Sequence, residues 1–356
     1  MNILTDFKQD VNTQKPIPGS YEWWYFDAQS IDGYSIVIIF YEGNPFSKRY
    51  IKAIAEGKDN LAALFPAVSI SLYKDGKPLF YAFEEFTVDE CSFSAEQPQG
   101  NAGKNRFEGE KNGDQIVYRI KLNQSVANGD SLKGTLEFRS ADQTYQLNEN
   151  DEANTNSAHR WNLIQPKANV TGKLKLSGSL NENISFNGTG YHDHNFGSEP
   201  MKDTFDEWYW GRYHFDDAVL IYYLMRVNNE WDKKAWLLSE TGDARVIPDD
   251  GIRFNHNQLS LFALSSARVL KFEDGDFKAH LQLDRLTDNG PFYQRFEGRI
   301  IATIGDKPQQ SRGISEYIKP KRIYKKLFWP LVDMRIKYPG RAHWVQRSKN
   351  LYKWTW

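Results

Sequence analysis

The chain has 356 residues, with 45 lysines and arginines, 46 acidic residues and a formal net charge of −1. This balance argues against a general nucleic-acid binder, and no apolar run of about 18 residues is present to span a membrane. A single cysteine, Cys91, excludes an intrachain disulfide framework and fits a reducing compartment. The first ten residues lack the basic start and apolar core of a secretory signal, so we expect a cytoplasmic protein.

The length favours two domains, each with its own core. Aromatic residues are abundant, with 11 Trp, 19 Tyr and 22 Phe. This content suggests large apolar cavities or aromatic-lined strands, although β-rich proteins also favour aromatic residues for packing alone. Both interpretations stay open at this point.

Most of the chain is predicted to form short strands separated by turns of Gly, Asn, Asp and Pro. The predicted strands are 34–41, 67–73, 79–87, 116–122, 134–138, 170–176, 218–226, 259–263, 269–272, 277–283 and 296–304. Four pairs that tolerate positive φ are typical of hairpins: Asp32-Gly33, Asp75-Gly76, Asn112-Gly113 and Asp274-Gly275. The pattern is all-β, and the best helical candidates are residues 48–64 and part of the basic C-terminal region.

The segment Glu-Trp-Trp-Tyr-Phe-Asp at 22–27 is predicted to be an aromatic strand. Glu22 and Trp24 then share one face, and Trp23 and Tyr25 share the other. Such a strand can simply help to close a barrel, or it can place Trp24 and Glu22 against a ligand.

This aromatic strand has an internal echo at an offset of 207 minus 22, or 185 residues. Tyr-Glu-Trp-Trp-Tyr at 21–25 matches Asp-Glu-Trp-Tyr-Trp at 206–210, and the apolar strand 36–39 meets 221–224. An aromatic strand, a turn and an apolar strand that occur twice predict two similar β-domains. We place the joint near residue 197, which gives two β-domains and a basic, aromatic extension: 1–197, 198–316 and 317–356.

The densest polar segment is Gly-Thr-Gly-Tyr-His-Asp-His-Asn-Phe-Gly at 188–197. In an extended segment its side chains alternate between two faces, one with Tyr191, Asp193 and Asn195 and the other with His192 and His194. The same alternation places the upstream His159 and Trp161 on a common face. We expect this acid, phenol, imidazole and indole to line one cavity.

Asp193 is the strongest candidate for a catalytic residue, because burial among aromatic rings favours the protonated acid. The alternative is a strand-end aspartate that bonds backbone amides. His159 can orient water or shuttle a proton, and Trp161 can stabilise a cation over its ring. Each of these two residues can also be purely structural.

A metal site is the competing interpretation, with ligands His159, His192, Asp193 and His194. It is disfavoured because His192 and His194 face away from Asp193 in a strand, and no His-x-x-x-His spacing occurs. Nucleophilic catalysis is weaker still, since Cys91 has no basic neighbour in sequence and no Gly-x-Ser-x-Gly elbow or phosphate-binding glycine loop is present. We therefore expect no metal.

The extension 317–356 holds 11 lysines and arginines and one acid, Asp333, so it carries +10 and the rest of the chain carries −11. Its cations are interleaved with Trp and Tyr, which suits the headgroup region of an anionic bilayer. This pattern predicts peripheral membrane contact. Alternatively, the aromatic rings dock on the body of the protein and the charges are solvated. No nucleic-acid motif accompanies the basic patch.

Four motifs occur in the order found in one known family: Tyr-Glu-Trp-Trp-Tyr-Phe-Asp at 21–27, His159-x-Trp161, Gly-x-Gly-Tyr-x-Asp-x-Asn-x-Gly at 188–197, and Trp-x-Trp-Gly-Arg at 208–212. Over most of its length the chain resembles the carotenoid 1,2-hydratase (hydroxyneurosporene synthase, CrtC) family and its AttH-like relatives. The resemblance implies two lipocalin-like β-barrels in tandem and cofactor-free chemistry on long hydrophobic isoprenoids. Fungal pericyclases, described as Diels-Alderases, look like more distant relatives.

Carried over position by position, the resemblance marks four catalytic residues: Asp193, Tyr191, His159 and Trp161. Protonated Asp193 would protonate a terminal trisubstituted alkene, and Trp161 would stabilise the resulting tertiary carbocation. Tyr191 and His159 would position water and recover the proton. We expect further substrate contacts from Trp24, Glu22, Asn195, Trp208, Trp210 and Tyr222.

The expected function is hydration of an alkene in a hydrophobic polyene or isoprenoid. If water is excluded, another alkene can capture the same cation, so an isoprenoid cyclase, isomerase or pericyclase on the same scaffold is the alternative. A noncatalytic lipid-binding module is the third interpretation.

Overall fold

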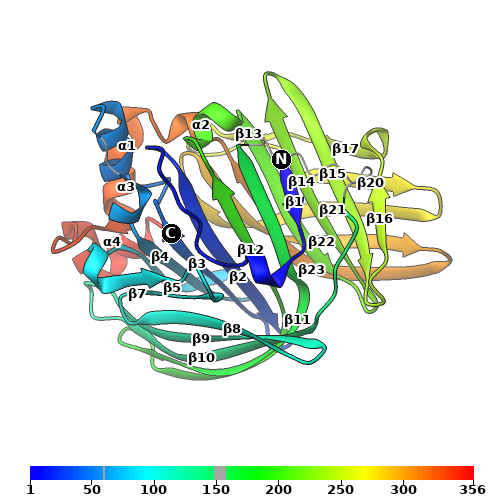
Figure 1. The fold of residues 1–356 in the computed structure, drawn as a ribbon, viewed down its shortest axis with the longest axis horizontal. Helices are drawn as coiled ribbons and strands as arrows, with labels where there is room; N and C mark the ends of the chain where they lie inside the picture. Colours follow the sequence, from blue (N-terminus) through cyan, green and yellow to red (C-terminus); the bar gives the residue numbers. More distant parts are fainter. Residues whose placement is uncertain (59–60, 148–157) are drawn as a thin grey trace. The chain divides into compact units, whose positions relative to one another are not determined.

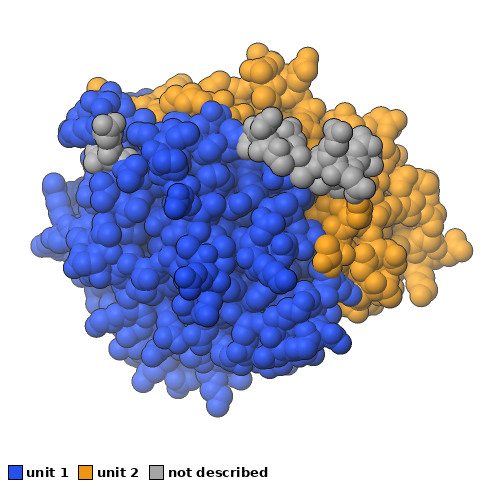
Figure 2. Space-filling view, viewed as in Figure 1, with its two compact units in different colours: residues 1–143, 153–201, 327–356 blue, residues 144–152, 202–326 orange. Residues whose placement is uncertain are grey.

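The computed structural model describes residues 1–58, 61–147 and 158–356, and the chain divides into two compact units. Unit 1 comprises residues 1–143, 153–201 and 327–356, and unit 2 comprises residues 144–152 and 202–326 (Figure 2). The residues from 327 onward therefore belong to the unit that also holds the N-terminus.

Unit 1 is built on a curled sheet that has 13 strands among the described residues (Figure 1). The strand order is β24-β5-β4-β3-β2-β12-β11-β10-β9-β8-β7-β6, and β1 pairs with β11. The strands are β1 (Asn2–Leu4), β2 (Tyr21–Ser30), β3 (Tyr34–Glu42), β4 (Ala67–Lys74), β5 (Lys77–Glu85), β6 (Cys91–Phe93), β7 (Gln99–Ala102), β8 (Asn105–Asn112), β9 (Gln115–Ser125), β10 (Ser131–Ala141), β11 (His159–Ser177), β12 (Glu182–Gly197) and β24 (Ile336–Lys337). The helices of this part of the chain are η1 (Phe7–Gln9), α1 (Lys48–Ala55), η2 (Ala62–Leu64), η3 (Val88–Glu90), α2 (Met201–Thr204), η6 (Lys326–Phe328), α3 (Trp329–Arg335), η7 (Trp344–Arg347) and α4 (Lys349–Lys353).

Unit 2 is built on a sheet of nine strands among the described residues, in the order β16-β15-β14-β13-β23-β22-β21-β20-β17. The strands are β13 (Glu207–His214), β14 (Ala218–Val227), β15 (Glu230–Ser239), β16 (Ala244–Ile247), β17 (Ile252–Asn255), β20 (Val269–Asp274), β21 (Phe277–Asn289), β22 (Tyr293–Ile304) and β23 (Lys307–Ile318). The small pair β18 (Gln258–Leu259) and β19 (Ser265–Ser266) and the short helices η4 (Asp249–Gly251) and η5 (Pro320–Arg322) complete it.

The two sheets repeat one topology. In unit 1, β2 has β12 on one side and β3, β4 and β5 in succession on the other. In unit 2, β13 has β23 on one side and β14, β15 and β16 on the other. The aromatic segments related by the 185-residue offset are thus equivalent strands, and the all-β prediction is confirmed.

The core of unit 1 forms where residues from β2–β5 and from β8–β12 pack into one cluster. β2 contributes Trp24, Phe26 and Ala28 to this cluster, and β3 contributes Ile36 and Ile38. The alternate side chains of β2 point to the opposite face, as the two-residue period of a strand requires. Each strand near the site therefore presents two distinct faces.

Two local predictions differ from the structure. Residues 48–64 do not form one helix: α1 ends at Ala55, Gly57 has a φ of 63° that favours glycine, and residues 59–60 lie outside the described residues. The predicted strand 259–263 is wrong beyond β18, because Ala263 has a φ of 54° in a turn.

Part of the C-terminal region folds onto unit 1. β24 pairs in parallel with β5, Lys48 forms an ion pair with Asp333, and the Tyr352 ring is buried against Tyr81 at a centroid distance of 6.2 Å. The helices α3 and α4 confirm that part of this region is helical. No helix in the described ranges is both long and apolar enough to cross a membrane.

Candidate active site

The predicted acid lies on β12, between β2 and β11. Asp193 is the cross-strand partner of Tyr25 on β2 and of Leu163 on β11, and Asn195 is the partner of Trp161. Cross-strand partners point to the same side of a sheet, so these side chains share the face opposite to the core of unit 1. The predicted alternation of side chains along β12 is confirmed.

The carboxylate of Asp193 accepts three hydrogen bonds from uncharged side chains. Trp161 Nε1 and Tyr191 Oη both donate to Oδ2 at 2.7 Å, and Asn195 Nδ2 donates to Oδ1 at 2.9 Å. Asp193 is only 3% exposed. Its three donors hold the buried carboxyl in place beside an indole and a phenol.

His159 lies on the same face as Trp161 and is neutral at physiological pH. Burial lowers the pKa of His159 to about 3, and the neighbouring Asn195 side chain opposes this effect only in part. The imidazole Nδ1 lies 3.1 Å from Tyr21 Oη. Asn195 donates to Asp193, so its amide lies beside both the imidazole and the acid.

The structure therefore brings together the four residues that the resemblance marks as catalytic, and Asn195 lies among them. It also adds Tyr21, which bonds to His159. Sequence reasoning gave Tyr21 no role, although this residue stands first in the aromatic motif. The available signal was its strand parity, since Tyr21 shares a face with Trp23 and Tyr25.

Trp24 and Glu22, which we expected to contact substrate, lie on the other face of the sheet, the face of His194. The Trp24 ring stacks on Phe93 and on His194, at centroid distances of 4.8 and 4.6 Å, within the core of unit 1. Glu22 bonds to His194 and Lys15. Strand alternation separates these two residues from Asp193.

The three predicted substrate contacts of unit 2 lie on two faces of its sheet. Trp208 and Trp210 share one face of β13, where the Trp208 ring packs edge-on against Phe205 at 4.4 Å. Tyr222 instead points into the core of unit 2, where its hydroxyl bonds to Ser315 Oγ at 2.6 Å. Burial raises the pKa of Tyr222 well above its ordinary value.

The four residues considered as metal ligands do not converge, because His192 and His194 lie on the face opposite to His159 and Asp193. Within residues 1–58, 61–147 and 158–356, no group of three or more His, Cys, Asp or Glu side chains is arranged to hold a metal ion. Burial raises the pKa of Cys91 to about 12, which keeps this residue a thiol at neutral pH.

Comparisons with known proteins agree with the motif resemblance. A family model described as carotenoid hydratase CrtC matches residues 110–347. A Chlorobaculum tepidum protein named hydroxyneurosporene dehydrogenase is 31% identical over 99% of this chain and 96% of its own length. An acyclic carotenoid 1,2-hydratase of Rubrivivax gelatinosus is 25% identical over 61% of this chain and 50% of its own length.

The fold also occurs in a solved structure. An AttH-like protein of Nitrosomonas europaea matches with a TM-score of 0.62 at 17% identity, covering 88% of this chain and 97% of that chain. At this identity the match shows the fold alone. The lipocalin-like architecture expected from the sequence is confirmed.

Proposed function

Because the chain belongs to the carotenoid hydratase CrtC family, we propose that it adds water to an alkene of a hydrophobic polyene or isoprenoid by cofactor-free acid catalysis. Family membership supports a hydratase-type enzyme. We propose in addition that Asp193 is the acid and that the reaction passes through a carbocation. The observation that carries it is the buried Asp193 carboxyl, with its hydrogen bonds from Trp161, Tyr191 and Asn195.

The proposed reaction begins when Asp193 transfers its proton to the less substituted carbon of a trisubstituted alkene. The π electrons form the new C–H bond, and the other carbon becomes a tertiary carbocation. The indole N–H of Trp161 is bonded to Asp193, so the Trp161 ring lies beside the acid, where it can stabilise the cation. Water adds to the cation and loses one proton, so the product gains one H2O.

His159 and Tyr191 are the residues proposed to place the water and recover its proton. His159 is neutral at the pH of the cell because its pKa is about 3. Water bound to a carbocation is strongly acidic, so even this weakly basic imidazole can take its proton. Asn195 lies beside both His159 and Asp193 and can orient them, and solvent water carries the proton from the His159 imidazolium back to the Asp193 carboxylate.

Asp193→Asn tests the acid directly. The amide keeps the shape of the side chain but has no proton to transfer, so we expect turnover to fall by about 10²–10⁴-fold with substrate affinity within about threefold. Asp114→Asn, at an exposed turn of unit 1, is the matched control and keeps full activity. Full activity of Asp193→Asn contradicts the proposal.

The mass of the product tests the reaction class. The wild-type product gains one water and, in D2O, one deuterium on carbon. A product that has lost two hydrogens, as the name of the Chlorobaculum tepidum relative implies for that protein, contradicts hydration.

Cyclisation is the second candidate, and the near-complete burial of Trp161 and Tyr191 favours it. Where water is kept from the cation, a second alkene of the same substrate captures it, and the product keeps the mass of the substrate. A pericyclic reaction gives the same mass but takes up no deuterium from the solvent. A noncatalytic lipid-binding module returns its ligand unchanged in mass and chromatographic retention.

We also propose that residues 341–354, within the predicted membrane-contact region, bind an anionic membrane surface. Trp344 is 64% exposed and Trp354 is 90% exposed, and the cations Lys349 and Lys353 are exposed beside them on α4. Exposed indoles and cations suit the headgroup region of a bilayer, whose hydrocarbon core takes up hydrophobic polyenes.

Sedimentation with phosphatidylcholine vesicles, with and without phosphatidylserine, tests this surface. We expect binding to the anionic vesicles, weakening with salt, and loss of binding in Trp344→Ala/Trp354→Ala and in Lys349→Glu/Lys353→Glu. Lys121→Glu, an exposed cation of β9, is the control. Unchanged binding in both double variants removes the membrane surface without affecting the proposed chemistry.

A further inference from the structure

The strands that hold Trp161 against Asp193 are paired irregularly beside the site. The register of β11 against β12 shifts between Leu163 and Gln165 and again between Gln165 and Ala168. β10 pairs with β11 only at residues 169–177, whereas β1 pairs with β11 at residues 160–162. The β10–β11 ladder therefore ends before the site, where β1 takes the place of β10, and β11 pairs with β12 again from Leu163 to His159 only after two register shifts.

Residues 2–15, called the N-terminal clamp below, contact β2, β11 and β12 on the face that carries the core of unit 1, here called the inner face. Asp6 N donates to Asn162 Oδ1 at 3.0 Å, and Asn162 Nδ2 donates to Asp6 O at 2.9 Å. Asn162 of β11 is the cross-strand partner of His194 on β12. The clamp therefore attaches to β11 directly opposite His194.

Asp10 attaches the same clamp to β12. Its Oδ2 lies 3.0 Å from His192 Nε2, and its Oδ1 lies 3.1 Å from His194 Nδ1. Tyr118 of β9 also donates its hydroxyl proton to Oδ2. Asp10 is fully buried. Its carboxylate therefore contacts two histidines of β12 and a tyrosine of β9 away from solvent.

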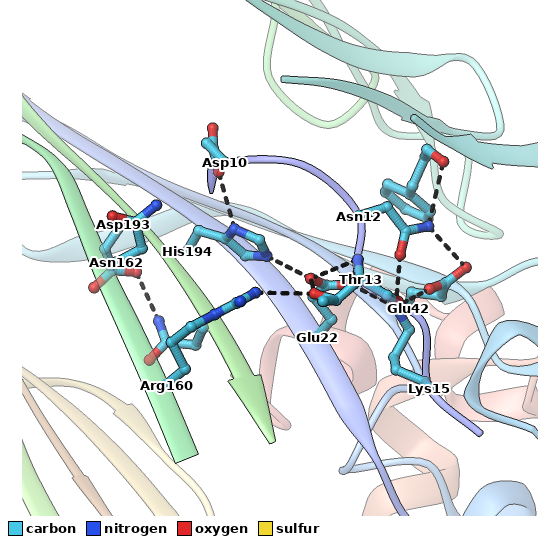
Figure 3. A network of polar contacts seen from close by, with 12 residues as sticks. Asp10, Asn12, Thr13, Lys15, Glu22, Glu42, Arg160, Asn162, Asp193 and His194 are labelled. Carbon is cyan, nitrogen blue, oxygen red and sulfur yellow. Dashed lines mark hydrogen bonds and ion pairs between the residues drawn. The ribbon is translucent and has the colours of Figure 1, made fainter. Parts of the chain in front are cut away.

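Glu22 of β2 extends the attachment. His194 Nε2 lies 2.8 Å from Glu22 Oε1, and Thr13 N donates to Glu22 Oε2 at 3.1 Å. Lys15 forms ion pairs with Glu22 and with Glu42 on β3. Figure 3 shows His194 between Asp10 and Glu22, with Thr13 and Lys15 further along the clamp. The clamp thus binds β11, β12, β2 and β3 in turn.

The contacts of the clamp are charged. Burial lowers the pKa of His194, but Asp10 and Glu22 outweigh burial and raise it to about 9. Burial raises the pKa of Asp10, but His192 and His194 outweigh it and lower the value to about 2. At neutral pH, His194 is therefore an imidazolium between two carboxylates. The other groups that face this cluster are His192, Tyr118, Lys15 and Arg160.

We infer that the N-terminal clamp, through Asn162, His192 and His194, holds β11 against β12 so that Trp161 stays bonded to Asp193. Asp10 and His194 are then positioning residues for the reaction, and this role rests on the proposed function of Asp193. The physical reason is that β12 is polar on both faces from Tyr191 to Asn195, so no contrast between apolar and polar side chains holds it in place there. The ion pairs of Asp10 and Glu22 with the histidines of β12, on the inner face, hold the strand in position instead.

The indole N–H of Trp161 reports this position without any need for turnover. We would record its NMR signal, assigned with Trp161→Phe, in the wild type, in Asp10→Asn and in His194→Gln. Loosening of β11 against β12 shifts this signal and speeds its exchange with solvent in both variants. We expect kcat to fall by about 10- to 100-fold while KM stays within about threefold, as for a misplaced catalytic group.

Asn105→Ala separates positioning from stability. Asn105 Nδ2 donates to Gln124 Oε1 at 2.7 Å in a buried pair between β8 and β9, away from β12. This variant lowers the melting temperature but keeps the Trp161 signal and kcat. If Asp10→Asn does not fold, His194→Gln carries the test.

An unchanged Trp161 signal and kcat in the folded variants overturns the inference, and so does the same change in Asn105→Ala. If the wild type turns over no polyene but the Trp161 signal still shifts in both variants, the result supports the clamp and rejects the proposed hydration.

Discussion

The two faces of β12 carry similar residue types in opposite electrostatic settings. On one face, Asp193 is bonded to an indole, a phenol and an amide, all uncharged. On the other face, Asp10 and Glu22 enclose a protonated His194. Paired charges stabilise the imidazolium form of His194, whereas the donors described around Asp193 carry no charge. Neighbouring residues of one strand can thus serve catalysis and anchoring separately.

His159 on β11 and His194 on β12 show the same contrast. Burial lowers the pKa of His159 to about 3, whereas the carboxylates around His194 overcome burial and raise its pKa to about 9. At neutral pH one histidine is neutral and the other is a cation. The two therefore affect stability at opposite ends of the pH range, and this difference can be measured.

Acidification gives the largest expected effect. The unfolded chain protonates His159 near pH 6.5 but the folded chain does so only near pH 3, so the free energy of unfolding falls as the pH decreases between these values. The shift corresponds to about 5 kcal/mol. Urea unfolding of His159→Gln should show this acid-side slope reduced by about one proton. If the slope is the same in His159→Gln as in the wild type, His159 does not have the lowered pKa expected from its burial.

Replacing one carboxylate on each face gives the next largest effect. Asp10→Asn leaves His194 with one carboxylate fewer, so we expect a loss of about 3–5 kcal/mol in the free energy of unfolding. Asp193→Asn weakens the hydrogen bonds from Trp161, Tyr191 and Asn195, and we expect a loss of about 1–2 kcal/mol. Equal losses in urea unfolding would erase the contrast between the faces.

Alkaline pH tests His194. Its folded pKa is raised, so its stabilising contribution is complete below about pH 6.5 and is lost as the pH rises through about 9. The expected loss is about 3 kcal/mol. Urea unfolding between pH 6 and 10 should show this decline in the wild type and not in His194→Gln. The same alkaline decline in both proteins would assign it to another group.

A matched pair of tyrosines gives the smallest effect. Tyr191 donates to Asp193 and Tyr118 donates to Asp10, so each Tyr→Phe change removes one phenol from one carboxylate. We expect Tyr118→Phe to lose about 2 kcal/mol of stability and to keep kcat within about twofold, because both histidines still bind Asp10. Tyr191→Phe should lower kcat by about tenfold. Thermal melts and initial rates distinguish the two, and identical behaviour would contradict the division of roles.

Strand alternation made part of the candidate site predictable. Tyr191, Asp193 and Asn195 share a face in any extended segment, and His159 and Trp161 do so as well. That the two segments meet depends on β11 lying beside β12 with Trp161 opposite Asn195. The order of the motifs along the chain indicated this meeting only through the family resemblance.

The aromatic motif of β2 has Trp24 and Glu22 on the face opposite to Asp193. Strand alternation separated Trp24 and Glu22 from Trp23 and Tyr25, and the face with Trp24 and Glu22 was the one expected to meet a ligand. In the structure Trp24 stacks inside the core, and Glu22 bonds to the clamp. The two-residue period of a strand separates the two faces, but which face packs into the core depends on the strands that cover it.

By itself, the sequence determined the all-β class, the repeated β-unit and the division of β12 into two polar faces. These features follow from turn residues, alternation and an internal offset, which are local or periodic properties of the chain. Only the tertiary structure decided which side chains surround each carboxylate. Asp10 meets His192 across 182 residues of chain, and Asp6 meets Asn162 across 156. Such contacts depend on how distant strands pack, and no local pattern specifies them.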